Sequence, residues 1–199
     1  AYITGVMWPA LAVTAIYAEP IIRFLYGQRW LECVPVVQQI CMVFALAVPF
    51  GFNNAAYMAI GRPYLSTLPT ALDIAVKGLG VWLLYDGTLA SFAWALVTAG
   101  VLMYPVHTFL QWRFLAFEQR PFLQAQGKSL VIALLCLAVA WLARELTAGL
   151  PALAEIAIIA AVAIPLWLAA IWVFDAPLRQ ELEGAARRIP LLSKWLGPA

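Results

Sequence analysis

Hydrophobic residues along this chain of 199 residues gather in six long runs, separated by short polar links. A helix needs about 20 predominantly apolar residues to cross the hydrocarbon core of a bilayer. Each run reaches or approaches that length, so the pattern predicts six transmembrane helices. The second run is longer than one crossing requires, and we expect it to tilt or kink near Pro49–Gly51. The runs cover residues 1–18, 33–60, 63–85, 88–111, 129–146 and 152–174.

The composition agrees with an all-α integral membrane protein. Hydrophobic residues make up 65% of the chain and charged residues 11%, with a mean hydropathy of +0.89. Soluble domains are nearer half apolar and a quarter charged. A net charge of +2 does not suggest a nucleic-acid partner, and three cysteines with one histidine show no metal-ligand spacing. We therefore expect no metal and no cofactor.

The chain divides into two expected units, a six-helix bundle over residues 1–175 and a tail over 176–199. It opens with "AYITGVMWPALAV", which has neither an initiator Met nor a basic leader segment. We therefore expect the sequence to begin inside a longer protein. It contains no catalytic motif, glycine-rich phosphate loop or paired catalytic carboxylates. No enzyme is predicted.

Arginine and lysine set the expected orientation. Links after the first, third and fifth runs hold Arg23, Arg29 and Arg144. The other links and the tail hold more basic residues, and an excess of Lys and Arg marks the cytoplasmic side. Both ends of the chain are therefore predicted to face the cytoplasm. The residues of this larger set are Arg62, Arg113, Arg120, Lys128, Arg179, Arg187, Arg188 and Lys194.

The tail has the pattern of one amphipathic helix. Apolar residues from Leu178 to Leu196 recur at three- and four-residue steps, which places them on one stripe. Basic residues flank the stripe and would favour a position in the cytoplasmic headgroup layer, against anionic lipid. The alternative is a helix that packs on the bundle or frays after Pro190. The basic residues expected at the membrane surface are Arg179, Arg187, Arg188 and Lys194.

An acid and a base interrupt the third run, near the expected middle of the bilayer. Asp73 and Lys77 are one helical turn apart, in the orientation that favours an intrahelical ion pair. They share one face with Ser66, Thr70 and Gly80, and the opposite face is leucine-rich. Charged side chains are costly against lipid, so we expect this stripe to face the bundle or a wet cavity.

Other polar residues can join this stripe. Asn53, Asn54 and Tyr57 lie toward the inner end of the second run, and Gln38 and Gln39 toward its outer end. A purely structural role stays open, because amides and ion pairs also hold transmembrane helices together. For His107, near the end of the fourth run, packing is the favoured role.

Two stretches carry a family resemblance. The segment "PIIRFLYGQRWLECVPVVQQICMVFAL" is followed at helix length by "NNAAYMAIGRPYLS". An outward loop with Gly27 and Trp30 and an inner turn with Gly61 and Arg62 resemble the C-terminal half of bacterial polysaccharide flippases. These O-antigen and exopolysaccharide exporters form the polysaccharide transport family of the multidrug/oligosaccharidyl-lipid/polysaccharide exporter superfamily. The chain departs from the family pattern at residues 87–90, where Gly–Thr–Leu–Ala replaces Gly–x–x–Gly.

The resemblance implies a fold and an activity. The fold would be the second lobe, with two extra helices, of a 14-helix exporter that also needs its N-terminal lobe. The activity would be alternating-access transport of an undecaprenyl-diphosphate-linked oligosaccharide across the bacterial cytoplasmic membrane. Lys77 would meet the negative charge of the substrate, with Asp73 beside it, in a cavity completed by Thr70, Asn53, Asn54 and Tyr57.

Two other classes stay open. A drug or cation antiporter of the same superfamily would share the fold but favour acidic cavity residues, so Lys77 argues mildly against it. A membrane-bound polysaccharide polymerase or ligase is the enzyme alternative. The longest outward link, "AEPIIRFLYGQRWLE", is too short and plain for the large external loop that such an enzyme needs.

Overall fold

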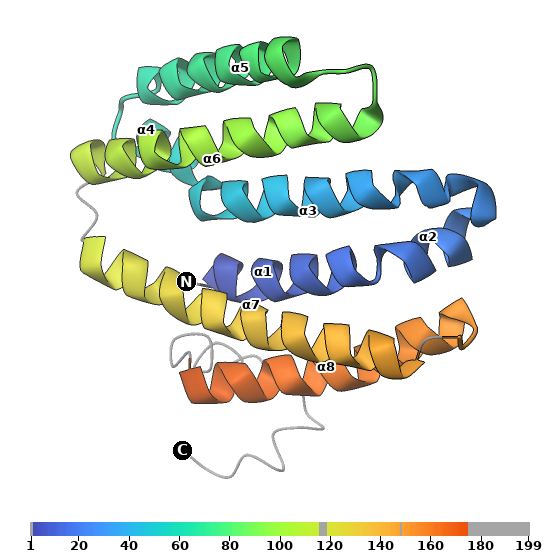
Figure 1. Cartoon of the computed structure of the whole chain (residues 1–199). Coiled ribbons are helices and arrows are strands. Elements are labelled where there is room, and N and C mark those ends of the chain that lie inside the picture. Colours follow the sequence, from blue (N-terminus) through green and yellow to red (C-terminus); the bar gives the residue numbers. More distant parts are fainter. Residues whose placement is uncertain (1, 116–118, 148, 175–199) are drawn as a thin grey trace, which may run out of the picture.

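The computed structural model describes residues 2–115, 119–147 and 149–174, and these residues form helices and connecting turns without a strand. Figure 1 shows roughly antiparallel helical passes, with the start of the first and the end of the last described helix at the same end of the bundle. The helices are α1 (Tyr2–Ile16), α2 (Ala18–Tyr26), α3 (Val34–Ala47), α4 (Asn53–Ala59), α5 (Tyr64–Leu84), α6 (Leu89–Phe114), α7 (Gln119–Thr147) and α8 (Ala152–Phe174), with short 3-10 helices η1 (Gln28–Cys33) and η2 (Val48–Phe50).

The helix lengths confirm the predicted helical membrane class. Within the described residues, five helical spans are long and apolar enough to cross a bilayer, and a sixth is obtained when α1 and α2 are counted as one bent span. The outer surface is apolar: beyond Tyr64 at its first position, five large side chains of α5 are each more than half exposed. Such an apolar surface is unfavourable in water and favourable in contact with lipid. These residues are Leu68, Ile74, Leu79, Trp82 and Leu83.

The first pass bends by 70° between α1 and α2. Pro20 in α2 has no backbone N–H, so it cannot donate to the carbonyl of Ile16 four residues earlier, and its ring crowds that carbonyl. The side chain of Arg144 on α7 replaces the missing donor, with Nη1 2.9 Å from the Ile16 oxygen. The bend therefore has a local cause and a partner from another helix.

The second pass is interrupted at the predicted place. Helix α3 ends at Ala47, η2 carries Pro49, and α4 begins at Asn53. The prediction for the fifth helix was wrong at its start, because α7 begins at Gln119 and not near residue 129. The segment 119–128 is polar but rich in good helix formers, so hydropathy does not detect it although it continues the helix.

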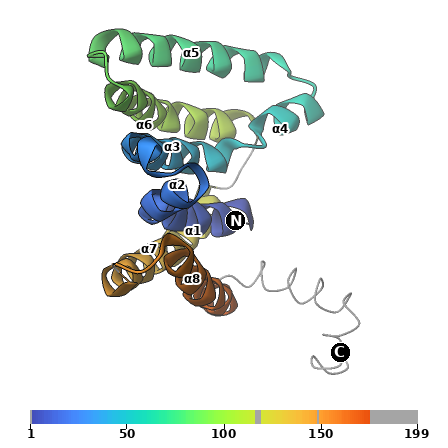
Figure 2. The same cartoon turned by 90° about the vertical axis from the view of Figure 1, so that its right-hand side faces the viewer.

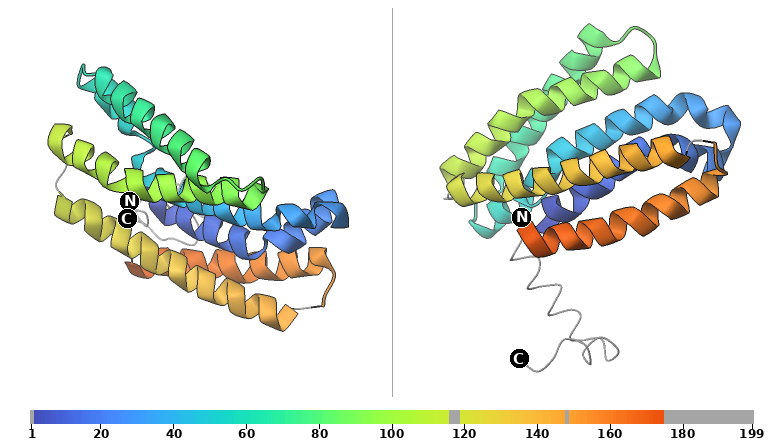
Figure 3. Two further views of the ribbon diagram at one scale, coloured as in Figure 1. Left: turned by 45° about the horizontal axis from the view of Figure 1, so that its top comes forward. Right: turned by 60° about the horizontal axis from the view of Figure 1, so that its bottom comes forward.

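The passes stack in an order that differs from the chain order. Figure 1 shows α5, α6, α3, α1, α7 and α8 in succession, and the principal contacts of α1 are with α7 and α3. Helix α5 is at one edge and packs mainly on α6, with α4 near its first turn. Figures 2 and 3 show α5 and α6 close together near their connecting loop and diverging toward α4.

The loop between α5 and α6 is closed by a cap at the start of α6. The Thr88 hydroxyl accepts a hydrogen bond from the Ser91 amide, and the Asp86 carboxylate accepts from the Thr88 amide and hydroxyl. Hydrogen bonds from Ser91 and Thr88 lower the pKa of Asp86 to about 2. Because this pKa is below its ordinary value, the cap stabilises the loop above about pH 4 and loses that contribution as the pH falls toward 2.

Candidate functional site

A cavity of about 280 Å³ lies beside the break in the second pass, where α3, α4, α5 and α6 meet. The residues of α5 and α6 that line it belong to the parts of these helices farther from their connecting loop, where the two helices have diverged (Figure 3). A second cavity, of about 340 Å³ between α1, α7 and α8, is lined almost entirely by apolar side chains. Of these two cavities, the first is the polar one. All six residues predicted for the site line it: Asn53, Asn54, Tyr57, Thr70, Asp73 and Lys77.

Helix α5 supplies the charged wall of this cavity. Lys77 Nζ is 2.5 Å from Asp73 Oδ2, and the side chains of Lys77 and Asp73 are 37% and 24% exposed. The pair is thus open on one side while held together within its own helix. An ammonium group has three donors, so Lys77 retains donors for a further acceptor in the cavity. The leucine-rich face of α5 points the other way.

Two polar side chains of α5 toward its first turn have their hydroxyls engaged. Thr70 Oγ1 donates to the carbonyl of Ser66 at 2.7 Å, and Ser66 Oγ donates to the carbonyl of Pro63 at the same distance. Each hydroxyl oxygen can still accept a hydrogen bond. These residues make the cavity wall polar but uncharged on the N-terminal side of the ion pair.

Helix α4 supplies buried amide and hydroxyl groups. Asn53 Oδ1 accepts a hydrogen bond from Gln111 Nε2 of α6 at 2.6 Å. Asn53 Nδ2 and the Tyr57 hydroxyl are buried and have no hydrogen-bond partner among the described residues. Buried polar groups are normally satisfied by protein or water, so these two groups are available to bound water or ligand. Asn54 is exposed at the edge of the cavity.

Helix α6 contributes residues that the sequence did not assign to the site. Tyr104, His107 and Gln111 recur at three- and four-residue steps on one face of α6. Phe50 of η2 packs on the first two, edge-on to Tyr104 with ring centroids 4.9 Å apart and stacked on His107 at 5.1 Å. Tyr104 and His107 both line the cavity. Their spacing is visible in the sequence, but the neighbour that brings them to the cavity depends on the break at η2.

Gln38 and Gln39, the other suggested partners of the stripe, do not line the cavity. Gln38 Nε2 donates to the carbonyl of Ala15 at 3.0 Å, and buried Gln39 faces Ala90 and Trp94 of α6. Both amides therefore connect helices. The tail residues expected at the membrane surface, Arg179, Arg187, Arg188 and Lys194, lie outside the described residues.

Among the described residues, no three or more His, Cys, Asp or Glu side chains are grouped so that they could bind a metal ion. What the cavity offers is one cation beside one anion, several neutral donors and acceptors, and an aromatic wall. That arrangement can bind and release a polar ligand. It contains no paired nucleophile and base.

Comparison with known protein families finds a match at the start of the chain. Residues 1–35 match the sequence model of a protein family described as polysaccharide biosynthesis protein. The matched segment holds α1, α2 and η1, including Gly27 and Trp30, and it is less than a fifth of the chain. No curated protein and no solved structure matches the chain significantly. The chain is thus a multi-pass helical membrane protein, by helix length and hydropathy, with similarity to polysaccharide biosynthesis proteins over its first 35 residues.

Proposed function

We propose that this chain is the C-terminal half of a carrier that moves an undecaprenyl-diphosphate-linked oligosaccharide from the inner to the outer leaflet of the bacterial cytoplasmic membrane. The observation that carries the proposal is the polar cavity inside a lipid-facing bundle, with the part-exposed Lys77 in its wall. The match of residues 1–35 to polysaccharide biosynthesis proteins supports the same substrate class.

The chemistry of the cavity fits a lipid diphosphate joined to a sugar. In a medium of low dielectric constant, an ammonium attracts phosphate more strongly than it does in water. Lys77 would bind the diphosphate, and Asp73 would keep Lys77 charged when the cavity is empty. The unpartnered Nδ2 of Asn53 and hydroxyl of Tyr57 would hydrogen-bond sugar hydroxyls. No bond is made or broken in this scheme, so we propose a transporter and not an enzyme.

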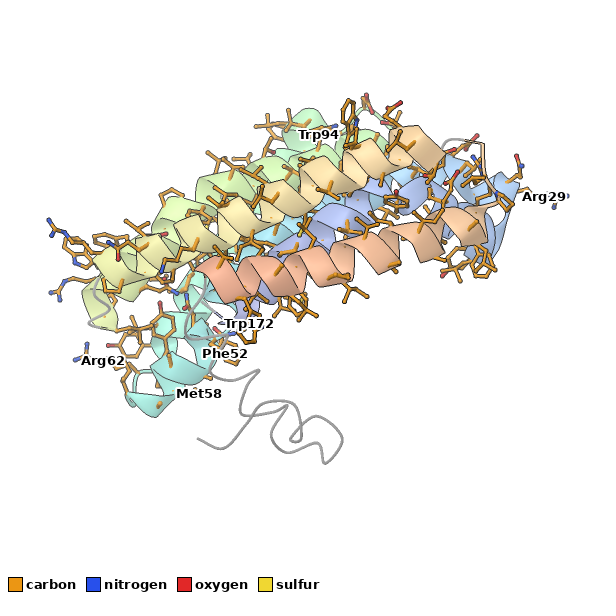
Figure 4. The ribbon with its side chains drawn as sticks, turned by 90° about the horizontal axis from the view of Figure 1, so that it is seen from below. Arg29, Phe52, Met58, Arg62, Trp94 and Trp172 are labelled. Atoms are coloured by element: carbon orange, nitrogen blue, oxygen red, sulfur yellow. The ribbon has the colours of Figure 1, made fainter. Side chains whose placement is uncertain are left out.

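The proposed placement in the membrane follows from basic residues at the two ends of the bundle. Arg29 and Arg62 lie at opposite ends (Figure 4), and the end with Arg62 is proposed to face the cytoplasm. Both ends of the chain would then be cytoplasmic. The proposed partners are membrane lipids, the lipid-linked oligosaccharide, and an N-terminal lobe of the same protein that would form the facing wall of the cavity.

Substituting the cavity lysine tests the proposal. Lys77→Met in the full-length protein should abolish polysaccharide export, because it removes the cation that holds the diphosphate. Lys128→Met is the matched control, since Lys128 is exposed on α7 and does not line the cavity. Export is measured as surface polysaccharide, and membrane abundance by immunoblot.

The two readouts separate the possible roles. Loss of export at normal abundance for Lys77→Met, with a normal Lys128→Met control, is the expected result. Unchanged export would refute the role of Lys77 in transport. A collapse in abundance would show that the ion pair is structural and would also count against the proposal.

A further inference from the structure

His107 is the second nitrogen base that lines this cavity, beside Lys77, and its ring is held by stacking on Phe50. The imidazole lies nearly parallel to the Phe50 ring, with an interplanar angle of 28° and a centroid distance of 5.1 Å. A stacked ring uses its face for packing, so its two nitrogens point along the ring plane, away from Phe50. Within the described residues neither nitrogen has a hydrogen-bond partner, and the side chain lines the cavity.

The groups around His107 set what its charge would do. Helix α5 presents Asp73 and Lys77, which line the same cavity as the imidazole. Helix α4 presents the neutral Asn53, Asn54 and Tyr57, α6 presents Tyr104, and the lining residues of α3 and η2 are apolar. When Asp73 and Lys77 are paired, the effects of their opposite charges on the imidazole nearly cancel. An added anion in the cavity would therefore be the uncompensated charge, and it would favour a protonated imidazole.

We propose that His107 is a second cationic ligand for the anionic part of the substrate, and that it takes up a proton when this anion binds. The inference rests on the proposed function, because it assigns the anion to the diphosphate. Binding and protonation then favour each other, since each lowers the free energy of the other by the same amount. Lys77 supplies one ammonium group to the cavity, and His107 adds a second positive charge when an anion is bound or the pH is low.

Binding of a lipid diphosphate to the purified full chain tests this assignment. The probe is geranylgeranyl diphosphate in detergent micelles, with geranylgeraniol as the uncharged control. The measured quantity is the Kd of His107→Gln divided by the wild-type Kd, at pH 5.5 and at pH 8.0. The titration of the ligand is common to both proteins and cancels in this ratio. We expect a ratio of about ten at pH 5.5, as for loss of a charge-assisted hydrogen bond, and near one at pH 8.0.

A second measurement excludes a packing role. His107→Phe keeps an aromatic ring against Phe50 but cannot be protonated. Titration calorimetry in buffers of different ionisation enthalpy gives the number of protons taken up on binding. Near pH 7 the wild type should take up more protons than either variant, by a fraction of one proton, and His107→Phe should bind as weakly as His107→Gln at pH 5.5. Equal proton uptake in all three proteins would overturn the inference.

The outcomes also separate this inference from the proposed function. If Lys77→Met loses the probe while the His107→Gln ratio stays near one at both pH values, the diphosphate site stands and the inference is wrong. If the wild type binds the probe no better than geranylgeraniol at either pH, the diphosphate site itself is refuted, and the role of His107 with it. Wild-type behaviour of His107→Phe in both measurements would reduce His107 to a packing residue.

Discussion

Asp73 and Lys77 are one helical turn apart in α5, and their pairing lowers the free-energy cost of a charged side chain within a membrane-spanning helix. Spacing of four residues lets the carboxylate and the ammonium meet at 2.5 Å without help from another helix. The pair is therefore formed before the cavity is filled. Because it is part-exposed, its contribution to stability is modest, and its importance is proposed to lie in holding Lys77 charged and in place.

Neutralising each member of the pair separately distinguishes an anion carrier from a cation antiporter. Asp73→Asn keeps the shape of the side chain and leaves Lys77 to bind the diphosphate, so we expect export to fall only a few-fold. Lys77→Met should abolish it. In a cation antiporter the order would be reversed, since the carboxylate would bind the cargo. Export and membrane abundance of the two variants, measured side by side, decide between the classes.

The residues of the cavity were only partly predictable from the sequence. Thr70, Asp73 and Lys77 follow from helical periodicity, because charge in an apolar run must turn away from lipid. His107 did not, because its place at the cavity depends on Phe50, and Phe50 reaches it only through the break at η2. Gln38 and Gln39 have the same polar character as Asn53, yet their side chains join neighbouring helices. Residue type alone does not separate these cases.

At the scale of the elements, α5 packs closely on α6 near their connecting loop and diverges from it toward α4 (Figure 3). The cavity lies between the diverged ends of the two helices. Gly80 marks the close end: a Cβ at Gly80 would lie 3.3 Å from the carbonyl oxygen of Ala95 in α6. Gly78 on the same helix has open space around it. The sequence predicts both glycines in a transmembrane helix, but only the packing of α5 on α6 shows which one permits close approach.

This contrast gives a matched pair of substitutions. Gly80→Leu should push α5 away from α6 and lower the free energy of unfolding by about 1–3 kcal/mol, as overpacking does. Gly78→Leu gains the same helix propensity without the clash and should be neutral or slightly stabilising. Thermal unfolding of the purified proteins in micelles measures both. Equal midpoints would mean that the close contact at Gly80 does not hold the hairpin together.

At the scale of the whole molecule, hydropathy predicts the number of passes but not their neighbours. The passes at α1 and α7 are far apart in sequence, yet they pack against each other. The order of the stack depends on side-chain fit and on a few polar contacts between helices, which a hydropathy pattern does not contain. The bend at Ile16–Ala18 is similar: Pro20 signals a break, but the sequence does not say which side chain satisfies the freed carbonyl.

Arg144 is that side chain, and it joins three elements. Its guanidinium donates to the carbonyl of Ile16 at the end of α1 and, at 2.6 Å, to Glu19 of α2, while Arg144 itself belongs to α7. Glu19 also pairs with Arg23, but that contact stays within α2. Arg144→Met therefore removes a link across the bundle, whereas Arg23→Met removes a contact inside one helix.

We expect the two arginine substitutions to differ in cost for this reason. Arg144→Met leaves the Ile16 carbonyl and one carboxylate oxygen without their donor and should lower the free energy of unfolding by about 1–2 kcal/mol. Arg23→Met should cost about 0.5 kcal/mol or less, as for a part-exposed pair within one helix, because it leaves no backbone carbonyl without a donor. In a double-mutant cycle with Glu19→Gln, coupling should be larger for Arg144 than for Arg23. If denaturation in micelles gives equal coupling for the two arginines, the bend is held by Pro20 and apolar packing alone, and the guanidinium is not what fastens α7 to the first pass.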